Sequence, residues 1–460
     1  MYNKHKLTTI AILVMTLSAC AVGPDYRSPD KVADITISSP YQQAELAQSW
    51  WQAFDDESLN RLIDRALDEN RTLAQAKANV DRAYAVFRDA DNDILPKGTL
   101  DAGYQASENA VLQRENESVI LRGYSTGANL SWDLDLFGKL RRASEAAEAQ
   151  AQQADILWHD AQVQLISQVA TSYGEYRGAQ LRLKVAEQNL QNLQQSRGIV
   201  MARLEAGMAS ELELTQIDVQ LHQVNASIPA YRVALLTADA TLSALLGQRP
   251  GQLELDDVPR LPQLKHPVSV VEGENYLRYR ADVASSERLL AARTAEIGVA
   301  TADLYPNVSI SGFLGFLSGP GLTLGSDTKS WSVAPSLSWQ AADLGSVRSR
   351  IRQAEASSQM ALAQFEQEVF DAINEMQLAL NSYNLSREQQ LSTELQWQAS
   401  TKAVDISRER YNAGSGEFLD LLDSERELLR SRDQLAQLQQ QSFLRLVDIY
   451  RSFGGGIQLI

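Results

Sequence analysis

The sequence contains a single cysteine, and its surroundings suit covalent attachment of lipid. Cys20 closes the run Leu17-Ser18-Ala19-Cys20, which follows a short basic region and the apolar stretch Leu7 to Leu17. That stretch is too short for a membrane span and is typical of a secretory signal. In a bacterial lipobox the thiol takes a diacylglyceryl group, and cleavage before the cysteine frees an amine for a third acyl chain. The pattern predicts a lipidated Cys20, with an ordinary signal peptide and an incidental cysteine as the alternative.

Four residues around a predicted helix turn could act on ions or on a conformational change. Arg410 and Tyr411 lie just before the turn residue Gly414, and Asp420 and Asp423 follow it. The i, i+3 spacing places the two aspartates on one helix face, so copies of that face lining a pore would bring their carboxylates together. The alternative is that acids in the first turns of a helix only stabilise its macrodipole. These residues are therefore a candidate gate, with ordinary helix-terminal charge as the competing interpretation.

Other chemistry has little support in the sequence. With four histidines and one cysteine, the composition argues against a Cys/His metal site. His159 precedes Asp160 in a helical segment, His222 and His266 stand alone, and neither G-x-S-x-G nor H-E-x-x-H occurs. A formal net charge of −16 argues against nucleic-acid binding, which needs a basic surface. We expect no enzymatic activity, no metal, no cofactor and no nucleic-acid partner.

The elements that would position the candidate gate are unusually long helices. From about Lys139 to Glu205 there is no proline and little glycine, and a helix of ~65 residues would be ~100 Å long. Gly207 is a predicted C′ residue, and Ser210 with Glu213 forms a capping box that starts the next helix. The same pattern returns from about Ser346 to Asn412. Such lengths suggest antiparallel, coiled-coil-like pairs, with a cytoskeletal or chaperone-like rod as the simpler alternative.

The chain is an internal duplication, because residues recur at a constant offset. Matching pairs at an offset of 207 are Trp132 and Trp339, Gly138 and Gly345, Arg203 and Arg410, and Gly207 and Gly414. Upstream, the segment Leu67 to Pro96 resembles Leu277 to Pro306 at an offset of 210. Each copy reads as helix, β-hairpin, long helix, turn and long helix. The first amphipathic helix is expected to run from about Leu59 to a point before Pro96.

Four segments between the helices alternate as strands, with one apolar face and one face of small polar residues. This is the pattern of an outer-membrane barrel with an aromatic girdle, and a soluble β-subdomain with one wet face is the alternative. Four strands cannot close alone, since the smallest barrels have ~8 strands and no open edge can face lipid. Several chains would have to build the barrel together. Candidate membrane-interface aromatics are Tyr104, Tyr124, Trp132, Trp331 and Trp339.

Over essentially the whole mature length, these residues resemble the TolC/OprM superfamily of outer-membrane efflux proteins, in its lipidated NodT-type branch. The marks are Cys20 with Val22-Gly23-Pro24-Asp25-Tyr26, then Trp51, Phe54, Asn70, the run Trp132 to Gly138, the stretch Arg280 to Pro306, Arg410-Tyr411 and Gly414. Two departures are Arg280-Ala281-Asp282, where the family usually has Arg-Pro-Asp, and Ala341 to Gly345, where it usually has Phe-Asp-Gly-Gly. These departures concern local geometry at a helix start and a strand exit.

The resemblance implies an α+β membrane protein that works as a homotrimer. Three chains would form a 12-stranded outer-membrane β-barrel, continued by a long 12-helix periplasmic α-barrel with an equatorial domain around it. The implied role is the passive exit duct of a tripartite efflux system with a periplasmic adaptor and an inner-membrane pump, expected to be of the RND type. Similar residues imply that Arg410, Tyr411, Asp420 and Asp423 lie at the periplasmic gate. The expected location is the Gram-negative outer membrane, anchored by lipid and extending into the periplasm.

These expectations divide the chain into six parts. They are a signal peptide (1–19), a lipidated tail (20–50), repeat 1 (51–247, hairpin about 97–136), an equatorial linker (248–278), repeat 2 (279–454, hairpin about 306–343) and a C-terminal tail (455–460). Two other functions stay open at this point: an exit duct for type I protein secretion, and a periplasmic rod without a pore. The lipobox favours efflux, because secretion ducts of the superfamily usually lack the lipid.

Overall fold

The computed structural model describes residues 21–28, 42–43, 49–110, 118–256, 258–264, 269–270, 280–319 and 325–456. The chain forms two compact units, each assembled from three separate stretches. Unit 1 comprises residues 1–30, 78–155 and 285–366, and unit 2 comprises residues 31–77, 156–284 and 367–460. The longer helices contribute residues to both units.

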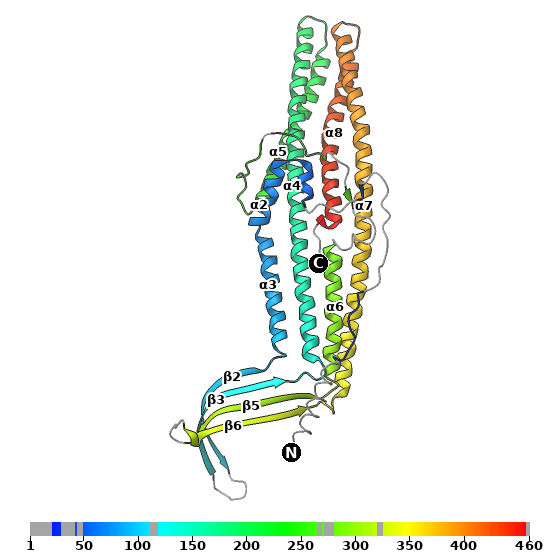
Figure 1. The fold of residues 1–460 in the computed structure, drawn as a ribbon. Helices are drawn as coiled ribbons and strands as arrows, with labels where there is room; N and C mark the ends of the chain where they lie inside the picture. Colours follow the sequence, from blue (N-terminus) through cyan, green and yellow to red (C-terminus); the bar gives the residue numbers. More distant parts are fainter. Residues whose placement is uncertain are drawn as a thin grey trace. The chain divides into compact units, whose positions relative to one another are not determined.

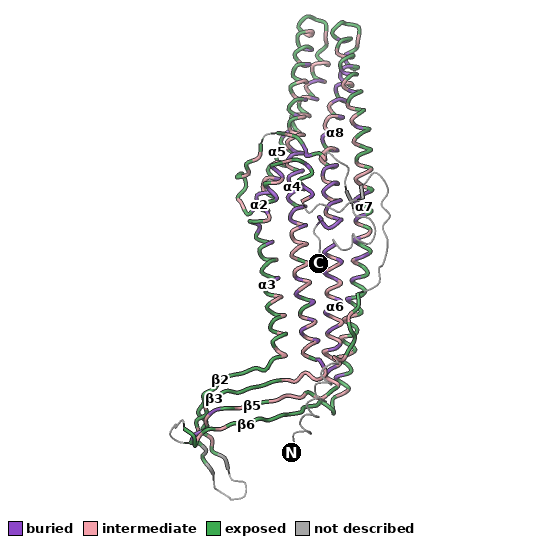
Figure 2. Tube along the Cα trace, viewed as in Figure 1, coloured by how far each residue is buried: buried purple, intermediate pink, exposed green. Residues whose placement is uncertain are grey.

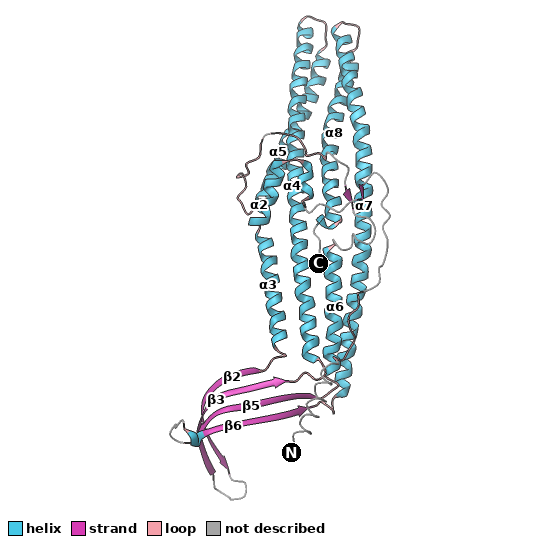
Figure 3. Cartoon of the chain, in the orientation of Figure 1, coloured by secondary structure: helices cyan, strands magenta, loops and turns pink. Residues whose placement is uncertain are grey.

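Unit 1 contains a four-stranded antiparallel sheet in the order β2-β3-β5-β6 (Figures 1 and 3). The strands are β2 Lys97–Ala110, β3 Ser118–Asp133, β5 Asn307–Ser318 and β6 Lys329–Ser338. Each copy of the repeat supplies one hairpin, and β3 pairs with β5 to join the two hairpins. The order leaves β2 and β6 at the two edges of the sheet.

The register of this sheet places most of the predicted apolar and small polar residues on opposite faces, with Phe313 and Leu317 of β5 as exceptions on the polar face. Leu100, Ala128, Leu314 and Trp331 are successive cross-strand partners and form one apolar row. The neighbouring row, on the other face, consists of Asp101, Gly127, Gly315 and Ser330. The apolar row is open to solvent in the single chain, with Leu100 88% and Trp331 71% exposed. An apolar surface so fully exposed requires a cover of some kind.

The long helices are confirmed close to their predicted ends. They are α4 Lys139–Glu205 and α7 Leu344–Asn412, with 67 and 69 residues, followed by α5 Glu211–Leu245 and α8 Phe418–Ser452. Ser210 and Glu213 form the predicted capping box at the start of α5. Gly207 and Gly414 have φ of 71° and 75°, as a helix C′ position requires. α8 begins three residues after Ser415, because the Ser415 and Gly416 amides both donate to the Arg410 carbonyl.

The prediction of one unbroken first helix is wrong, because the chain breaks at Asn70. The structure has α2 Glu57–Glu69 and α3 Arg71–Asn92, separated by Asn70 with ψ of 124°. The Asn70 side chain accepts from the Leu73 amide at 2.9 Å and donates to the Leu245 carbonyl at 2.9 Å. Its Oδ1 thus caps α3 while its Nδ2 binds the end of α5. The spacing of apolar residues cannot reveal such a break, because it carries no information about a side chain that takes the place of a backbone hydrogen-bond partner.

The duplication is visible in equivalent contacts. The indoles of Trp132 and Trp339 donate to the carbonyls of Ile94 and Leu304, at 3.0 and 3.1 Å. Likewise Asn70 donates to the Leu245 carbonyl, and Arg280, its counterpart at an offset of 210, donates to the Ser452 carbonyl at 2.7 Å. In each copy, the residue before the helix that leads into the β-hairpin therefore binds the carbonyl at the end of that copy's last helix. In the second copy this helix is α6 Ala281–Ala302, the counterpart of α3.

Aromatic packing closes the core of unit 2. The 3-10 helix η1 Trp50–Phe54 places the Trp50 ring on Tyr450, with centroids 4.5 Å apart, and Phe54 against Phe443 at 5.2 Å. Figure 2 shows buried positions along α4 and α8 in this unit. Two short strands, β1 Gln42–Gln43 and β4 Ser269–Val270, pair in parallel.

The end of α8 is more ordered than a tail. Gly454–Gly456, at the boundary between repeat 2 and the predicted C-terminal tail, form the buried 3-10 turn η4. A Cβ on Gly455 would lie 2.9 Å from Cγ1 of Val163, so the turn packs tightly on α4. The remaining short element is η3 Ser326–Thr328, before β6.

Candidate functional site

Three helices and the start of a fourth meet around Tyr411, in a group that we call the turn cluster: Arg203, Glu213, Tyr411 and Phe418. The Tyr411 side chain, 3% exposed, donates its hydroxyl hydrogen to Glu213 Oε2 at 3.1 Å. Arg203 donates to the Tyr411 carbonyl at 2.7 Å and holds its guanidinium 4.3 Å from the ring centroid. Phe418 packs against the same ring at 5.8 Å. The cluster thus joins the α4–α5 hairpin to the α7–α8 hairpin.

The electrostatics of the turn cluster keep the tyrosine neutral. Burial, and then the Glu213 carboxylate, raise the pKa of Tyr411 to about 12. The phenol therefore stays protonated and able to donate at neutral pH. Hydrogen bonds to charged groups contribute more than neutral ones, and an arginine over an aromatic face adds to them. The arrangement is able to hold two helical hairpins together through a few polar contacts.

The structure brings only one of the four predicted gate residues into this cluster. Arg410 and Asp420 are exposed, and Asp423 pairs with Arg426 one turn later at 3.5 Å. The Arg410 carbonyl, rather than its guanidinium, organises the turn. Asp420 and Asp423 are both exposed on α8, as expected of two residues that share one helix face.

Sequence reasoning missed two carboxylates that fasten α8. Glu425 is buried, accepts from Ser196 Oγ of α4 at 2.7 Å and pairs with Arg408 of α7 at 3.1 Å. Asp433 pairs with Arg182 of α4 at 2.8 Å and accepts from the Tyr231 hydroxyl of α5 at 2.9 Å. The partners on α4 and α5 lie more than 200 positions away, so no local pattern could have revealed them.

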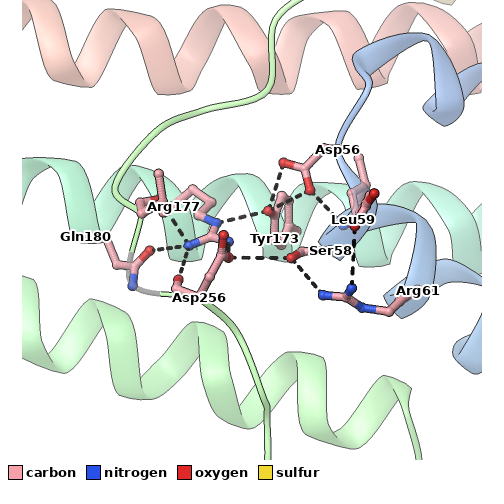
Figure 4. Close-up of polar contacts among 10 residues, drawn as sticks. Asp56, Ser58, Leu59, Arg61, Tyr173, Arg177, Gln180 and Asp256 are labelled. Atoms are coloured by element: carbon pink, nitrogen blue, oxygen red, sulfur yellow. Dashed lines mark hydrogen bonds and ion pairs between the residues drawn. The ribbon is translucent and has the colours of Figure 1, made fainter.

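A further polar network, drawn in Figure 4, attaches the segment after α5 to α4. Arg177, 2% exposed, donates to the Tyr173 hydroxyl at 2.9 Å and to the carbonyls of Asp256 and Val258 at 2.7 and 3.1 Å. It also forms an ion pair with the Asp256 carboxylate. Tyr173 in turn donates to Asp56, which caps α2. One arginine therefore connects a helix start, a long helix and part of the predicted equatorial linker.

The predicted interface aromatics lie on the sheet of unit 1. Tyr104 and Tyr124 are cross-strand partners with ring centroids 4.8 Å apart. Trp132 and Trp339 lie where β3 and β6 end, with their indole N–H groups bound to carbonyls, and Trp331 is exposed on the apolar row. An aromatic body with a satisfied polar group suits a boundary between lipid and water.

The predicted lipid anchor, as well as any metal site or membrane-spanning helix, can be compared with the structure only over the described residues. Cys20 and the predicted signal peptide lie outside them. Among the residues that the structure does describe, no group of three or more His, Cys, Asp or Glu is arranged to hold a metal ion. Over the same ranges, no helix combines the length and apolar character that a membrane crossing needs.

Comparison with known proteins finds similarity along nearly the whole chain. The family model for "Outer membrane efflux protein" matches residues 62–248 and 274–455. Nodulation protein T of Rhizobium leguminosarum bv. viciae is 28% identical over 440 residues, covering 94% of this chain and 89% of that protein. Outer membrane protein OprJ of Pseudomonas aeruginosa is 29% identical over 454 residues, covering 97% and 95%. The solved structure of the outer-membrane channel OprN has a TM-score of 0.91 at 40% identity, covering 95% of this chain and 99% of that chain.

Proposed function

This chain belongs to the outer membrane efflux protein family, and we propose that it is the exit duct of a tripartite efflux system in the outer membrane of a Gram-negative bacterium. The duct is passive. An inner-membrane pump of the RND type supplies the energy, a periplasmic adaptor bridges pump and duct, and small molecules such as drugs or toxic compounds leave through it. Support comes from the similarity to OprJ, an outer membrane protein, and to OprN, an outer-membrane channel.

The observation that carries this proposal is the apolar row on a sheet with two free edges. Lipid is the cover that suits an exposed strand face with aromatic ends. Because lipid cannot satisfy an open edge, β2 of one copy must pair with β6 of the next. Three copies of a four-stranded sheet supply 12 strands, enough for a closed barrel. The proposal therefore includes a homotrimer whose α4, α5, α7 and α8 helices form a 12-helix barrel in the periplasm.

Reconstituted protein is expected to conduct ions across a planar bilayer and to have the mass of three chains in detergent. Leu314→Arg places a charge on the lipid face and should reduce insertion, at a cost of about 2–4 kcal/mol per strand. Ser311→Arg, on the opposite face of the same strand, is the matched control and should insert normally with altered ion selectivity. A stable monomer, or a trimer without conductance, would contradict the duct.

We also propose that Asp420 and Asp423 line the periplasmic entrance, with Arg410 and Tyr411 beside it. The double variant Asp420→Ala, Asp423→Ala should weaken block by divalent cations added on the periplasmic side. The loss should be roughly 30-fold, since two nearby carboxylates contribute about 1 kcal/mol each in water. Asp448→Ala is the control on the same helix. Asp448 pairs with Arg445 at 3.5 Å, just as Asp423 pairs with Arg426 at 3.5 Å. Equal block in both variants would leave the aspartates as ordinary helix-terminal charge.

Lipidation of Cys20 is the last part of the proposal. The lipobox motivates it, and residue 21 is alanine rather than the aspartate of the inner-membrane retention signal. More than one acyl chain gives stable membrane attachment. Radioactive palmitate should label the wild-type chain and should not label Cys20→Ser. Unlabelled wild-type protein would refute this part without affecting the channel.

A further inference from the structure

The residues that follow the predicted lipidation site Cys20 are held on unit 1 by a dense set of contacts. We name residues 21–26 the strap. The Val22 amide donates to the Phe137 carbonyl at 3.1 Å, and the Val22 carbonyl accepts from Arg142 Nε at 3.2 Å. Arg142, 5% exposed, also donates to Asp25 Oδ1 at 2.6 Å. The Tyr26 hydroxyl donates to Glu287 Oε1 at 2.6 Å. The strap is thus bound through backbone and side chains alike.

Glycines form the floor under the strap and allow the backbone to approach closely. A Cβ on Gly298 of α6 would lie 2.9 Å from the Val22 carbonyl oxygen and 2.7 Å from Cγ of Arg142. A Cβ on Gly138, just before α4, would lie 2.7 Å from Cα of Ala21. On the strap side, Gly23 has φ of 94°, and its own Cβ would lie 2.5 Å from Cα of Gly298. None of these positions can carry a side chain while the strap is bound.

The internal repeat shows that this groove is specific to one copy. At an offset of 210, Gly298 corresponds to Arg88, and at an offset of 207, Arg142 corresponds to Ser349. The other copy therefore has a long side chain where the floor needs none, and it lacks the guanidinium that binds the strap. Glycine inside a helix is costly to its stability, so its presence at Gly298 of α6 requires a compensating contact. The strap supplies that contact.

We propose that the groove formed by Arg142, Gly298 and Gly138 is a docking site for the chain's own residues 21–26, which fixes the lipid anchor at the junction between β3 and α4. Cys20 is bonded directly to Ala21 in the sequence, and Ala21 lies on Gly138 at this junction. The acyl chains then enter the membrane beside the strands that their own chain contributes, instead of at the end of a free tether. This consequence for the lipid rests on the lipidation of Cys20 proposed above, whereas the docking does not.

Amide exchange of residues 21–28 in the purified full-length trimer tests the docking. Arg142→Gln and Gly298→Arg should speed exchange in this segment roughly 10- to 150-fold, the range that corresponds to loss of a hydrogen bond to a charged group. Gly198→Arg is the matched control, because Gly198 is also a helical glycine but has open space around it. Asp25→Asn with Tyr26→Phe alters only the strap, so it should speed exchange even if a groove variant fails to fold. A Val22 amide that exchanges freely in the wild type, despite its bond to the Phe137 carbonyl, would overturn the docking site.

A photoactivatable fatty acid incorporated in living cells tests the position of the lipid. In the wild type, crosslinks should concentrate on β3, β5 and the residues that join β3 to α4, and in Arg142→Gln they should scatter. Absence of any label would refute lipidation of Cys20 and leave the exchange result standing. Label with scattered crosslinks in the wild type would instead overturn the fixed anchor, so the two failures are distinguishable.

Discussion

Arg177→Ala is expected to lower the free energy of unfolding by about 3 kcal/mol. The guanidinium is buried, and its removal strips hydrogen bonds from Tyr173 and from two carbonyls of the segment after α5. Breaking a buried ion pair costs about 3–5 kcal/mol, and the lower end applies because the Asp256 side chain is 57% exposed and can regain water. Arg177→Lys should recover only part of the loss, since one ammonium cannot reach all these acceptors.

The midpoint of heat-induced loss of helical circular dichroism in detergent measures this change. Trypsin should also cut faster after Arg260, because residues 258–264 lose their attachment to α4. Arg197→Ala is the control on the same helix. Its ion pair with Asp218 joins side chains that are 41% and 31% exposed. Solvent therefore screens the pair, and little change is expected. If both variants melt alike, the network in Figure 4 has no special role in joining the segment to α4.

The same network predicts a dependence on acid. Its hydrogen bond with Arg177 lowers the pKa of Asp256, so the folded chain binds fewer protons there than the unfolded chain. The stabilisation is therefore present above the ordinary carboxyl pKa and is lost as the pH falls through the lowered value. Arg177→Ala should remove this part of the acid sensitivity.

Local sequence signals predicted the regular elements well. The absence of proline located α4, the pair Ser210 and Glu213 located the start of α5, and alternation located the strands and their two faces. Each of these signals acts within a few residues along the chain, so it is legible without the fold. The repeat offset added long-range information, because it showed that a second hairpin and a second helix pair must exist.

The residues that hold these elements together were not predictable in the same way. The Tyr411–Glu213 bond spans 198 positions and the Tyr26–Glu287 bond spans 261. Nothing in the types or spacing of such residues distinguishes them from solvated surface charge until the helices are packed. The break at Asn70 was missed for a related reason, since its side chain caps α3 at the Leu73 amide and also binds the Leu245 carbonyl at a distant helix end.

Loosening the turn cluster is expected to raise the resting conductance of the channel. Tyr411→Phe removes the hydrogen bond to Glu213, and Arg203→Gln removes the cation above the ring. Hydrogen bonds to charged groups contribute about 1.5–3 kcal/mol. If separation of the two hairpins opens the entrance, the equilibrium between closed and open channel should shift toward open. The shift should be roughly 10- to 150-fold for each chain whose turn cluster is disrupted. Single-channel recording in planar bilayers measures the open probability directly.

Alkaline pH provides an independent test of the same contact. The pKa of Tyr411 is raised to about 12, so the contact is fully present below the ordinary tyrosine pKa near 10 and is lost as the pH rises through 12. Wild-type conductance should therefore rise over this range, and the part due to Tyr411 should be absent in Tyr411→Phe. The sheet variant Tyr124→Phe is the control for removal of a phenol outside the turn cluster. Arg410→Ser tests whether the exposed neighbour of Tyr411 matters as well. Arg410 organises the turn through its backbone carbonyl, which the substitution retains, so this variant should conduct like the wild type. A Tyr411→Phe channel that opens and titrates like the wild type would show that the cluster only packs the helices.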